Sequence, residues 1–429
     1  AVHVAMYAAG APLYRDFRTP PFIPLVYGPL VPMITAKLLP LFGGGPMGAL
    51  EAGRALTIAS TFVTCGAIFV LARRMGSSRG AALTAMLAFA LSPIVMRWGF
   101  GYRVDMPALA CELAGLAAFS WSAPVALAMF VSAFFIKQGH AVGIATAVLF
   151  CWMSGARRSA LILGFMWLMA VTAGTLMVTA RYPDYFLNTF GAVRTTNFDF
   201  TAPVFFFGIM VGGAPGLMIF SVFALTRHRA TDRLILCLAI AAAIHDTASC
   251  LRWGSNAYYF LPLLAAMAIL SSAGIDLAFE RTRVMRPVAQ LAAGGAIALL
   301  LGVGFLFARG PDLTTNPWDP HALAKLQSID GPILTDAAEL NLVDSQPNLQ
   351  WIDLMVLMSM QEIGSFDDRP LLADIRARRI AAFALDPEGL KRNFRGRPLF
   401  WPQLRSAIET NYAALPGIGP PLVLVARPR

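Results

Sequence analysis

Long apolar segments separated by short basic loops are the feature that most constrains what this chain can fold into. A helix of about 20 mostly apolar residues crosses a bilayer. Segments of this kind occupy residues 54–72, 80–97, 159–180, 202–226, 233–250, 257–279 and 287–308. A denser apolar stretch over 106–153 divides at Trp121–Pro124 and at Lys137–His140, which predicts three shorter helices. The fold class predicted is mainly α: a polytopic transmembrane bundle of about ten spans.

The basic residues between these segments predict an orientation. The loops 73–79, 155–158, 227–233 and 280–286 are all rich in arginine. If 106–153 makes three crossings, all four loops lie on one side, which the positive-inside rule makes cytoplasmic. Only 14% of the residues are charged, against about 25% in soluble domains. The net charge of +10 therefore indicates membrane topology, and we expect a lipid bilayer and no nucleic acid as a partner.

Three regions follow from this topology. Residues 1–53 form a first outer loop, because six prolines between residues 20 and 40, two just before and four within the apolar run 22–42, interrupt this segment and predict short helices on the membrane surface. Residues 54–308 form the transmembrane domain. Residues 309–429 form a small α/β domain outside the membrane, with strands expected at 331–336, 380–386 and 421–428 and an amphipathic helix at 367–379.

Ionisable residues near a membrane are costly and are therefore candidate site residues. Those on the outer side are Arg15, Asp16, Arg18, Arg97, Arg103, Asp105, Lys137, His140, Arg181, Asp184, Arg194 and Asp199. Asp105 begins a helix before Met106 and Pro107, so it fits both a helix N-cap and a residue facing a cavity. Lys137 fits both an ammonium that reaches the interface and a buried cation that binds a phosphate.

Other polar residues leave their roles open. Tyr258 and Tyr259 fit an interfacial aromatic belt as well as a binding site. Asp246 fits a proton-relay pair with His245 and equally a partner for Arg252. His321, alone in the outer domain, fits a surface histidine. The five cysteines lie in or beside apolar segments and fit small packing residues.

The order of several short motifs resembles a known superfamily. These motifs are "GAPLYRDF", "FGGGPMGALEAGRAL", "RVDMPALACELAGL", "FFIKQGHAVGIATA" and "NAYYFLPLLAAMAILSSAGI". Their sequence along residues 1–280 resembles the GT-C integral-membrane glycosyltransferases, within them the bacterial protein-mannosyltransferase and aminoarabinose-transferase type. The resemblance implies transfer of a sugar from a polyprenyl-phosphate donor to a lipid, glycan or protein acceptor. It also implies a bacterial inner (plasma) membrane protein whose C-terminal domain is extracytoplasmic.

The resemblance also implies where the site lies. Asp16 and Asp105 are the expected catalytic acids, and Asp105 matches an acid of the second outer loop. Lys137 matches a basic residue beside the donor phosphate. The expected substrate-binding residues are Tyr14, Arg15, Arg103, Lys137, Gln138, His140, Tyr258 and Tyr259. An acid can take the proton of the acceptor hydroxyl, and cations can stabilise the departing phosphate.

Two features depart from the superfamily's pattern. Its acidic pair usually precedes the "GxPLYRDF" stretch by about a dozen residues, and residues 1–9 contain no acid. We therefore expect an N-terminally truncated chain in which Asp16 is the only first-loop aspartate. No cofactor is certain. A divalent cation, magnesium or manganese, is compatible, but two isolated aspartates do not make a metal site.

Two other classes of protein fit the composition. A secondary transporter would explain the spans and Asp246, but it predicts inverted repeats that the sequence does not show. A non-enzymatic membrane assembly protein would leave the outer cluster of charges without a role.

Overall fold

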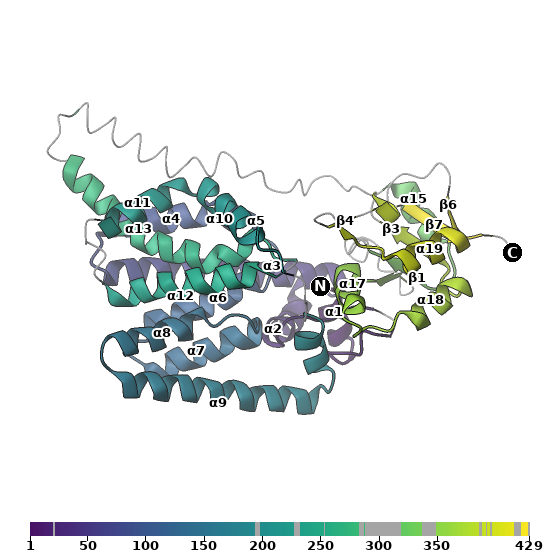
Figure 1. The fold of residues 1–429 in the computed structure, drawn as a ribbon, viewed down its shortest axis with the longest axis horizontal. Coiled ribbons are helices and arrows are strands. Elements are labelled where there is room, and N and C mark those ends of the chain that lie inside the picture. Colours follow the sequence, from purple (N-terminus) through teal and green to yellow (C-terminus); the bar gives the residue numbers. More distant parts are fainter. Residues whose placement is uncertain are drawn as a thin grey trace.

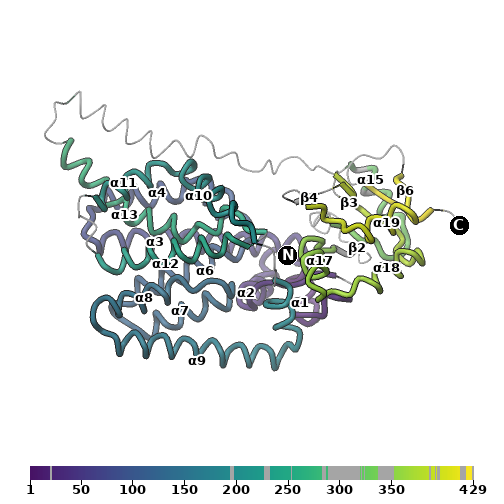
Figure 2. The backbone as a smooth tube through the Cα atoms, in the orientation of Figure 1, coloured from purple at the N-terminus to yellow at the C-terminus, as the bar shows by residue number. Residues whose placement is uncertain are grey.

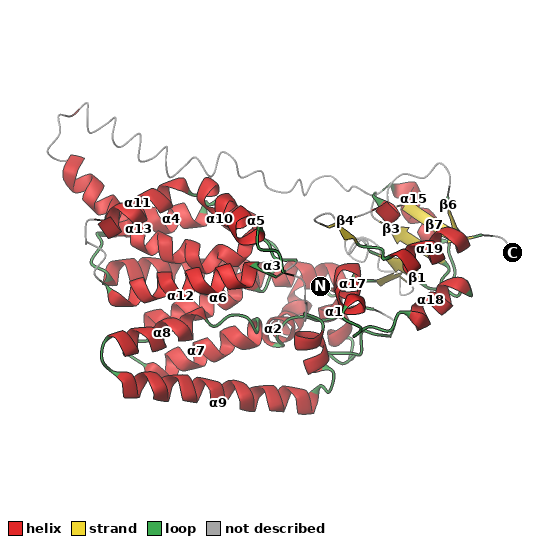
Figure 3. Ribbon diagram, in the orientation of Figure 1, coloured by secondary structure: helices red, strands yellow, loops and turns green. Residues whose placement is uncertain are grey.

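A computed structural model describes residues 1–19, 22–193, 198–226, 232–252, 254–282, 287, 319–336, 349–385, 388–391, 393–394, 397–415 and 422–427. Figure 1 shows a helical bundle on one side and a smaller domain of strands and helices on the other, with α1 and α2 between them. Coloured by secondary structure, the strands are confined to the smaller domain (Figure 3). The predicted fold class is confirmed.

The first outer loop contains short helices, as predicted. They are α1 (Val2–Ala8), α2 (Leu30–Leu38) and a 3₁₀ turn (Leu39–Phe42). Gly28 brings this loop against the end of α7, because its N–H donates to the Ile136 carbonyl at 3.2 Å. A Cβ at Gly28 would lie 2.0 Å from the Phe135 carbonyl oxygen, so only glycine fits this approach.

The bundle follows the apolar segments. Its helices are α3 (Gly45–Arg74), α4 (Arg79–Ala90), α5 (Pro93–Trp98), α6 (Asp105–Ala118), α7 (Ala123–Ile136), α8 (Val142–Met153), α9 (Arg157–Arg181), α10 (Ala202–Gly213), α11 (Pro215–Thr226), α12 (Arg233–Cys250) and α13 (Leu261–Thr282). The predicted division of 106–153 into three helices is confirmed by α6, α7 and α8. A π-helical turn (Leu187–Gly191) follows α9, and a 3₁₀ turn (Ala257–Phe260) precedes α13.

Three predicted boundaries need correction. The segment 202–226 is not one straight span, because α10 and α11 meet at 94°. Pro215, which disfavours a helical residue before it, follows Ala214 at the bend. The segment 80–97 breaks in the same way before Pro93. Helix α3 begins at Gly45 rather than 54, after Gly44 with φ of 79°.

Four helices in the described part are long and apolar enough to cross a membrane: α3, α9, α12 and the helix formed by 257–282. The α10–α11 pair makes a fifth if it is counted as one span. Helices α4, α7 and α8 are apolar but shorter. Helix α9 begins at the end of the bundle farthest from the smaller domain and ends beside α1 (Figure 1). The predicted span 287–308 lies almost entirely outside the described residues.

The smaller domain is built on a five-stranded sheet of order β2-β1-β3-β7-β6. Its strands are β1 (Ile333–Thr335), β2 (Leu349–Trp351), β3 (Ala382–Leu385), β6 (Tyr412–Ala414) and β7 (Leu422–Ala426). Strand β1 runs parallel to β2 and β3, and β7 is antiparallel to β3 and β6. The three strands predicted at 331–336, 380–386 and 421–428 are confirmed as β1, β3 and β7. A separate hairpin joins β4 (Asn393–Phe394) and β5 (Arg397–Pro398).

Both faces of this sheet are covered by helices. The alternation of a strand sends Ile333 and Ala382 toward α15 (Pro320–Gln327), while Leu334 and Phe383 pack on the opposite side. That side is covered by α17 (Leu354–Glu362), α18 (Arg369–Arg376) and α19 (Pro402–Asn411). The predicted helix at 367–379 is α18.

The first outer loop connects the smaller domain to the bundle. Phe17 and Phe22 are buried in the same apolar cluster as Leu357 of α17. The backbone N–H of Asp353 donates to the Phe22 carbonyl at 3.3 Å. Figure 2 shows the purple loop tube passing beside α17. Helix α17 therefore lies over the end of the bundle at which Lys137 is found.

Candidate active site

A buried ion pair lies at the end of the bundle beneath α17. Asp105, the first residue of α6, accepts a hydrogen bond from Lys137 Nζ at 2.5 Å. Their side chains are 3% and 11% exposed, respectively. Lys137 directly follows α7 and opens the short turn before α8. Of the two alternatives left open for Asp105, the N-cap is not observed, because Val104 is the cap residue and the Asp105 carboxylate binds Lys137.

Aromatic rings surround the cationic side of this pair. Tyr258 and Tyr259 are stacked, with ring centroids 5.0 Å apart. Lys137 Nζ lies 4.3 Å from the Tyr259 centroid and 5.3 Å from that of Tyr258. The Arg103 guanidinium lies 5.3 Å from the Tyr258 centroid and 4.5 Å from that of Trp98. The negative faces of these rings attract the two cations, and the Asp105 carboxylate binds Lys137 from the other side.

A cavity of about 630 Å³ opens beside Lys137. Its walls come from the first outer loop, the α7–α8 turn, α12, the 257–260 turn and α17. The residues that carry its chemistry are Tyr27, Lys137, Gln138, His245, Arg252, Tyr258, Tyr259 and Ser359. Lys137 faces this cavity while Asp105 lies behind it. The structure thus gathers four of the predicted substrate-binding residues around one space: Lys137, Gln138, Tyr258 and Tyr259.

Each residue of the α7–α8 turn is held by a different element. Gln138 Nε2 donates to the carbonyls of Val26 and Thr189 at 2.6 and 2.7 Å. The Gly139 carbonyl binds His245 Nε2 of α12 at 2.6 Å. His140 Nδ1 lies 3.2 Å from Glu112 Oε2 of α6. The predicted role of His140 in substrate binding has no support from position, since this buried side chain does not line the cavity.

Glu112 is a buried acid that the sequence reasoning missed. Its side chain is 2% exposed, and Oε1 accepts the N–H groups of Val142 and Gly143 at 2.8 and 3.3 Å. These are the first N–H groups of α8, whose own preceding residue supplies no side-chain cap. Glu112 follows Asp105 by seven residues, which places both on one face of α6. That spacing, together with an acid inside an apolar stretch, was the available signal.

The open question about Asp246 is resolved by its contacts. Its Oδ1 lies 2.8 Å from His245 Nδ1, and its Oδ2 accepts the Leu263 N–H at 2.9 Å. The side chain is fully buried. Within the described residues Asp246 therefore pairs with His245 rather than with Arg252.

The first-loop residues predicted for the site lie elsewhere. Asp16 forms an exposed ion pair with Arg18 at 2.8 Å and does not line the 630 Å³ cavity. The hydrogen bonds from Arg18 hold the pKa of the Asp16 carboxyl below its ordinary value. Arg15 does not line it either, although its carbonyl accepts a hydrogen bond from Asn188. The structure does not bring Asp16 together with Asp105.

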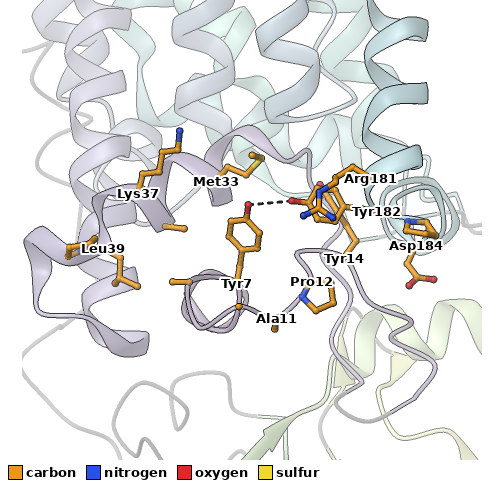
Figure 4. A pocket seen from close by; sticks show the side chains of 15 residues that line it. Tyr7, Ala11, Pro12, Tyr14, Met33, Lys37, Leu39, Arg181, Tyr182 and Asp184 are labelled. Carbon is orange, nitrogen blue, oxygen red and sulfur yellow. Dashed lines mark hydrogen bonds between the residues drawn. The ribbon is translucent and has the colours of Figure 1, made fainter.

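Tyr14 lines a second, larger cavity of about 840 Å³ between α1, α2 and the end of α9. Figure 4 shows the hydroxyls of Tyr7 and Tyr182 meeting there, with the Lys37 ammonium turned away from them. The Tyr14 hydroxyl donates to the Tyr27 carbonyl at 2.8 Å. Since Tyr27 lines the smaller cavity, the first outer loop forms a wall between the two spaces.

No group of three or more histidine, cysteine, aspartate or glutamate side chains suited to a metal occurs among the residues the structure describes. Asp105 is bound to Lys137, and Glu112 to His140 and backbone N–H groups. These acids lack the oxygen-only surroundings that magnesium or manganese would need. Neither acid is therefore assigned to a divalent cation.

The bundle, the outer loop with its short helices and the small α/β domain together match the GT-C fold. The chain is similar to ArnT from Cupriavidus metallidurans in the apo state, with a TM-score of 0.63 and 15% identity over 100% of this chain and 93% of ArnT. The structure of ArnT from the same organism bound to undecaprenyl phosphate is also similar, with a TM-score of 0.61 and 16% identity over 100% of this chain and 93% of ArnT.

A more distant likeness is to AglB from Archaeoglobus fulgidus, an archaeal oligosaccharyltransferase solved with an inhibitory peptide and a dolichol-phosphate. Its TM-score is 0.55 at 11% identity, over 90% of this chain and 65% of AglB. A scan against protein-family models finds no match. A search of the curated proteins finds none either. The likeness in structure confirms the fold that the motif order predicted.

Proposed function

We propose that this membrane protein is a glycosyltransferase that moves a sugar from a polyprenyl-phosphate donor to an acceptor on the extracytoplasmic side of a bacterial inner membrane. The observation that carries the proposal is Lys137, a buried cation at the wall of a 630 Å³ cavity. Proteins sharing the fold support it, because ArnT was solved with undecaprenyl phosphate and AglB with dolichol-phosphate. The acceptor class, whether lipid, glycan or protein, stays open.

Lys137 suits the phosphate of such a donor. When the bond between the sugar C1 and the phosphate oxygen breaks, negative charge grows on the phosphate while the sugar becomes oxocarbenium-like. A fixed ammonium in a site with little water stabilises that charge without reorganising. Arg252 on the same cavity wall adds a second cation. Lys137 is therefore the group assigned to the leaving phosphate.

Asp105 supports this role from behind the cavity. Its carboxylate fixes the direction of the Lys137 side chain through the 2.5 Å contact. It also offsets the cost of burying an ammonium. Because Asp105 does not line the cavity, we assign it the positioning of Lys137 rather than proton removal from the acceptor.

Tyr258 and Tyr259 complete the polar end of the cavity. Their stacked rings present a flat surface beside Lys137, which suits contact with a sugar ring. The remainder of the wall is mostly apolar, with Val26, Phe190 and Met355 among its members. A cavity with one charged end and apolar walls fits an amphiphilic donor.

The test is transfer from a synthetic polyprenyl-phosphate sugar by protein reconstituted in nanodiscs. Lys137→Gln should lower kcat/KM by about 100-fold or more, the usual loss when one charge-stabilising donor is removed. Asp105→Asn should lower kcat/KM less than Lys137→Gln does, because the ammonium remains at the cavity and only its orienting carboxylate is lost. The matched control is Lys325→Gln, which removes an exposed lysine from α15 of the outer domain.

A single substitution leaves a buried charge unpaired and can unfold the protein. The double variant Lys137→Gln/Asp105→Asn is neutral and keeps a hydrogen-bonding pair. A well-folded double variant with wild-type transfer would overturn the proposed role of Lys137. Wild-type protein without transfer from any polyprenyl-phosphate sugar would overturn the proposed function.

A further inference from the structure

The α7–α8 turn is fixed by a pair on α12, a partly exposed histidine and a buried aspartate, that the proposed reaction does not use. His245 binds the Gly139 carbonyl through Nε2 at 2.6 Å and Asp246 through Nδ1 at 2.8 Å. Gly139 lies two residues after Lys137. Asp246 is itself held by the Leu263 N–H of α13. A continuous line of contacts therefore runs from α13 through Asp246 and His245 to the turn that carries Lys137.

The partners of His245 specify its protons. A carbonyl oxygen can only accept, so Nε2 must donate to Gly139. The contact between Nδ1 and Asp246 then requires one more proton, either on Nδ1 or on the carboxyl. In both cases the pair carries no net charge. The His245 ring therefore donates from Nε2 to the Gly139 carbonyl, and its contact with Asp246 keeps the proton on Nε2.

We propose that His245 and Asp246 are positioning residues, which hold the Gly139 carbonyl so that Lys137 is fixed at the cavity. The inference rests on the proposed function, since Lys137 is the group being positioned. Gln138 and His140 anchor the same turn to the first outer loop and to α6. The His245 contact is the anchor from α12, and it reaches the turn between those two.

The charged groups around His245 come from each neighbouring element. Asp246 lies on α12 itself, Glu112 on α6, and His140 on the turn, with its ring centroid 6.0 Å from that of His245. Glu112 is already bound to His140 and to the α8 backbone. Asp246 is therefore the acid in contact with His245, and its removal is the direct way to change the proton of the ring.

His245 also lines the cavity, so a role as general base for the acceptor hydroxyl is the competing assignment. The two roles respond oppositely to Asp246→Asn. An asparagine can donate from Nδ2 to Nδ1, accept the Leu263 N–H through its oxygen, and leave Nε2–H bound to Gly139. Positioning is then preserved, whereas a base whose orienting carboxylate is lost would be severely impaired.

The experiment compares wild type, Asp246→Asn and His245→Phe/Asp246→Asn, using full-length protein in nanodiscs with a synthetic polyprenyl-phosphate sugar. The single and the double variant differ only at residue 245, whose imidazole binds Gly139. Neither variant carries a charge at positions 245 and 246 when the imidazole is neutral. Asp246→Asn should stay within about threefold of the wild-type kcat. The double variant should lose about 10- to 100-fold in kcat with little change in donor KM, as expected when a reacting group is displaced.

The pH profile gives a second readout. Wild type should lose activity at alkaline pH, where the pair gives up the shared proton and one contact loses its hydrogen. Asp246→Asn should keep its activity to higher pH, because its neutral imidazole still donates to Gly139. A structural role remote from Lys137 would not produce this difference.

Each other result counts against the inference. Loss of activity in Asp246→Asn equal to that of the double variant would assign His245 to proton transfer. Full activity in a folded double variant, alongside an inactive Lys137→Gln, would overturn the positioning role while leaving the proposed function standing. Wild-type protein that transfers no sugar would overturn both.

Discussion

At the scale of residues, three acids of the bundle are each bound to a basic side chain at or near the site. Asp105 holds Lys137, Glu112 holds His140, and Asp246 holds His245. Each acid lies on a bundle helix, and two of the three partners lie in one short turn. Burying a charge is costly unless it is paired and hydrogen-bonded. The three pairs therefore make that turn one of the most strongly determined parts of the fold.

Glu112 offers a prediction at this scale, because it caps a helix on a neighbouring segment. Glu112→Ala would leave the N–H groups of Val142 and Gly143 buried without an acceptor. We expect a loss of about 2–3 kcal/mol in the free energy of unfolding, since hydrogen bonds to charged groups are among the stronger ones. Denaturant unfolding in detergent micelles measures this change in the free energy of unfolding.

Glu112→Gln is the matched control, because its amide oxygen can still accept from the α8 backbone. It should lose less than half as much as the alanine variant. Equal losses in the two variants would show that charge rather than capping is what Glu112 contributes.

The sequence indicated which residues lie at the site better than it indicated what they bind. For Lys137, Tyr258 and Tyr259 the sequence left an interfacial role and a site role open, and the structure places all three on one cavity. The partners could not be predicted in the same way. Asp105 and Lys137 are 32 residues apart, and only the packing of α6 against α7 decides that they meet. Asp16 shows the converse, since its neighbour Arg18 satisfies it locally.

At the scale of elements, close backbone approaches decide how the segments pack. The contact between Gly28 and the end of α7 places the first outer loop against the Lys137 turn. A second such approach joins α13 to α11, where a Cβ on Gly274 would lie 2.0 Å from the Phe220 carbonyl oxygen. Both depend on the absence of a side chain.

Gly28→Ala should therefore displace the loop from α7. Overpacking of this kind costs about 1–3 kcal/mol in the free energy of unfolding, and we expect a matching fall in thermal stability. Gly66→Ala in α3 is the control, because a Cβ there meets nothing within 4 Å. That variant should be neutral or slightly stabilising, since alanine favours a helix. Similar melting temperatures for the two variants would contradict the prediction.

The same elements show where sequence patterns stop being informative. Apolar length predicted α9, α12 and α13 nearly to their ends, because a long helix is fixed by composition alone. It failed at 202–226, where the residues on both sides of Pro215 are equally apolar and the bend depends on the local backbone. Strands β2 and β6, which have three residues each, were not predicted.

At the scale of the whole molecule, the first outer loop joins the outer domain to the bundle. Phe22 packs edge-on against Phe366, with ring centroids 6.4 Å apart at 87°. Phe366 in turn contacts Trp401 of the outer domain. Helix α17, which follows Asp353, supplies Met355, Val356 and Ser359 to the cavity wall. The position of the outer domain therefore affects the shape of the cavity.

A double-mutant cycle on Phe22→Leu and Phe366→Leu tests this connection. Edge-to-face aromatic pairs contribute about 0.5–1.5 kcal/mol beyond their buried area, and we expect a coupling energy in that range from unfolding curves. The matched control pairs Phe22→Leu with Phe383→Leu, since Phe383 packs edge-on against Tyr412 in the sheet. Additive effects in both cycles would show that the loop and the domain are not coupled through Phe22.

The two ion pairs nearest the turn also bear on how the chain is made. Asp105 and Glu112 lie on α6, and their partners Lys137 and His140 follow within 35 residues. All four belong to one hairpin with the start of α8, so a growing chain has synthesised each acid and its partner before α9 begins. His245 and Asp246 come more than 100 residues later. Both acids can thus enter lipid with their hydrogen-bond partners already made, and the anchor from α12 is added to the turn afterwards.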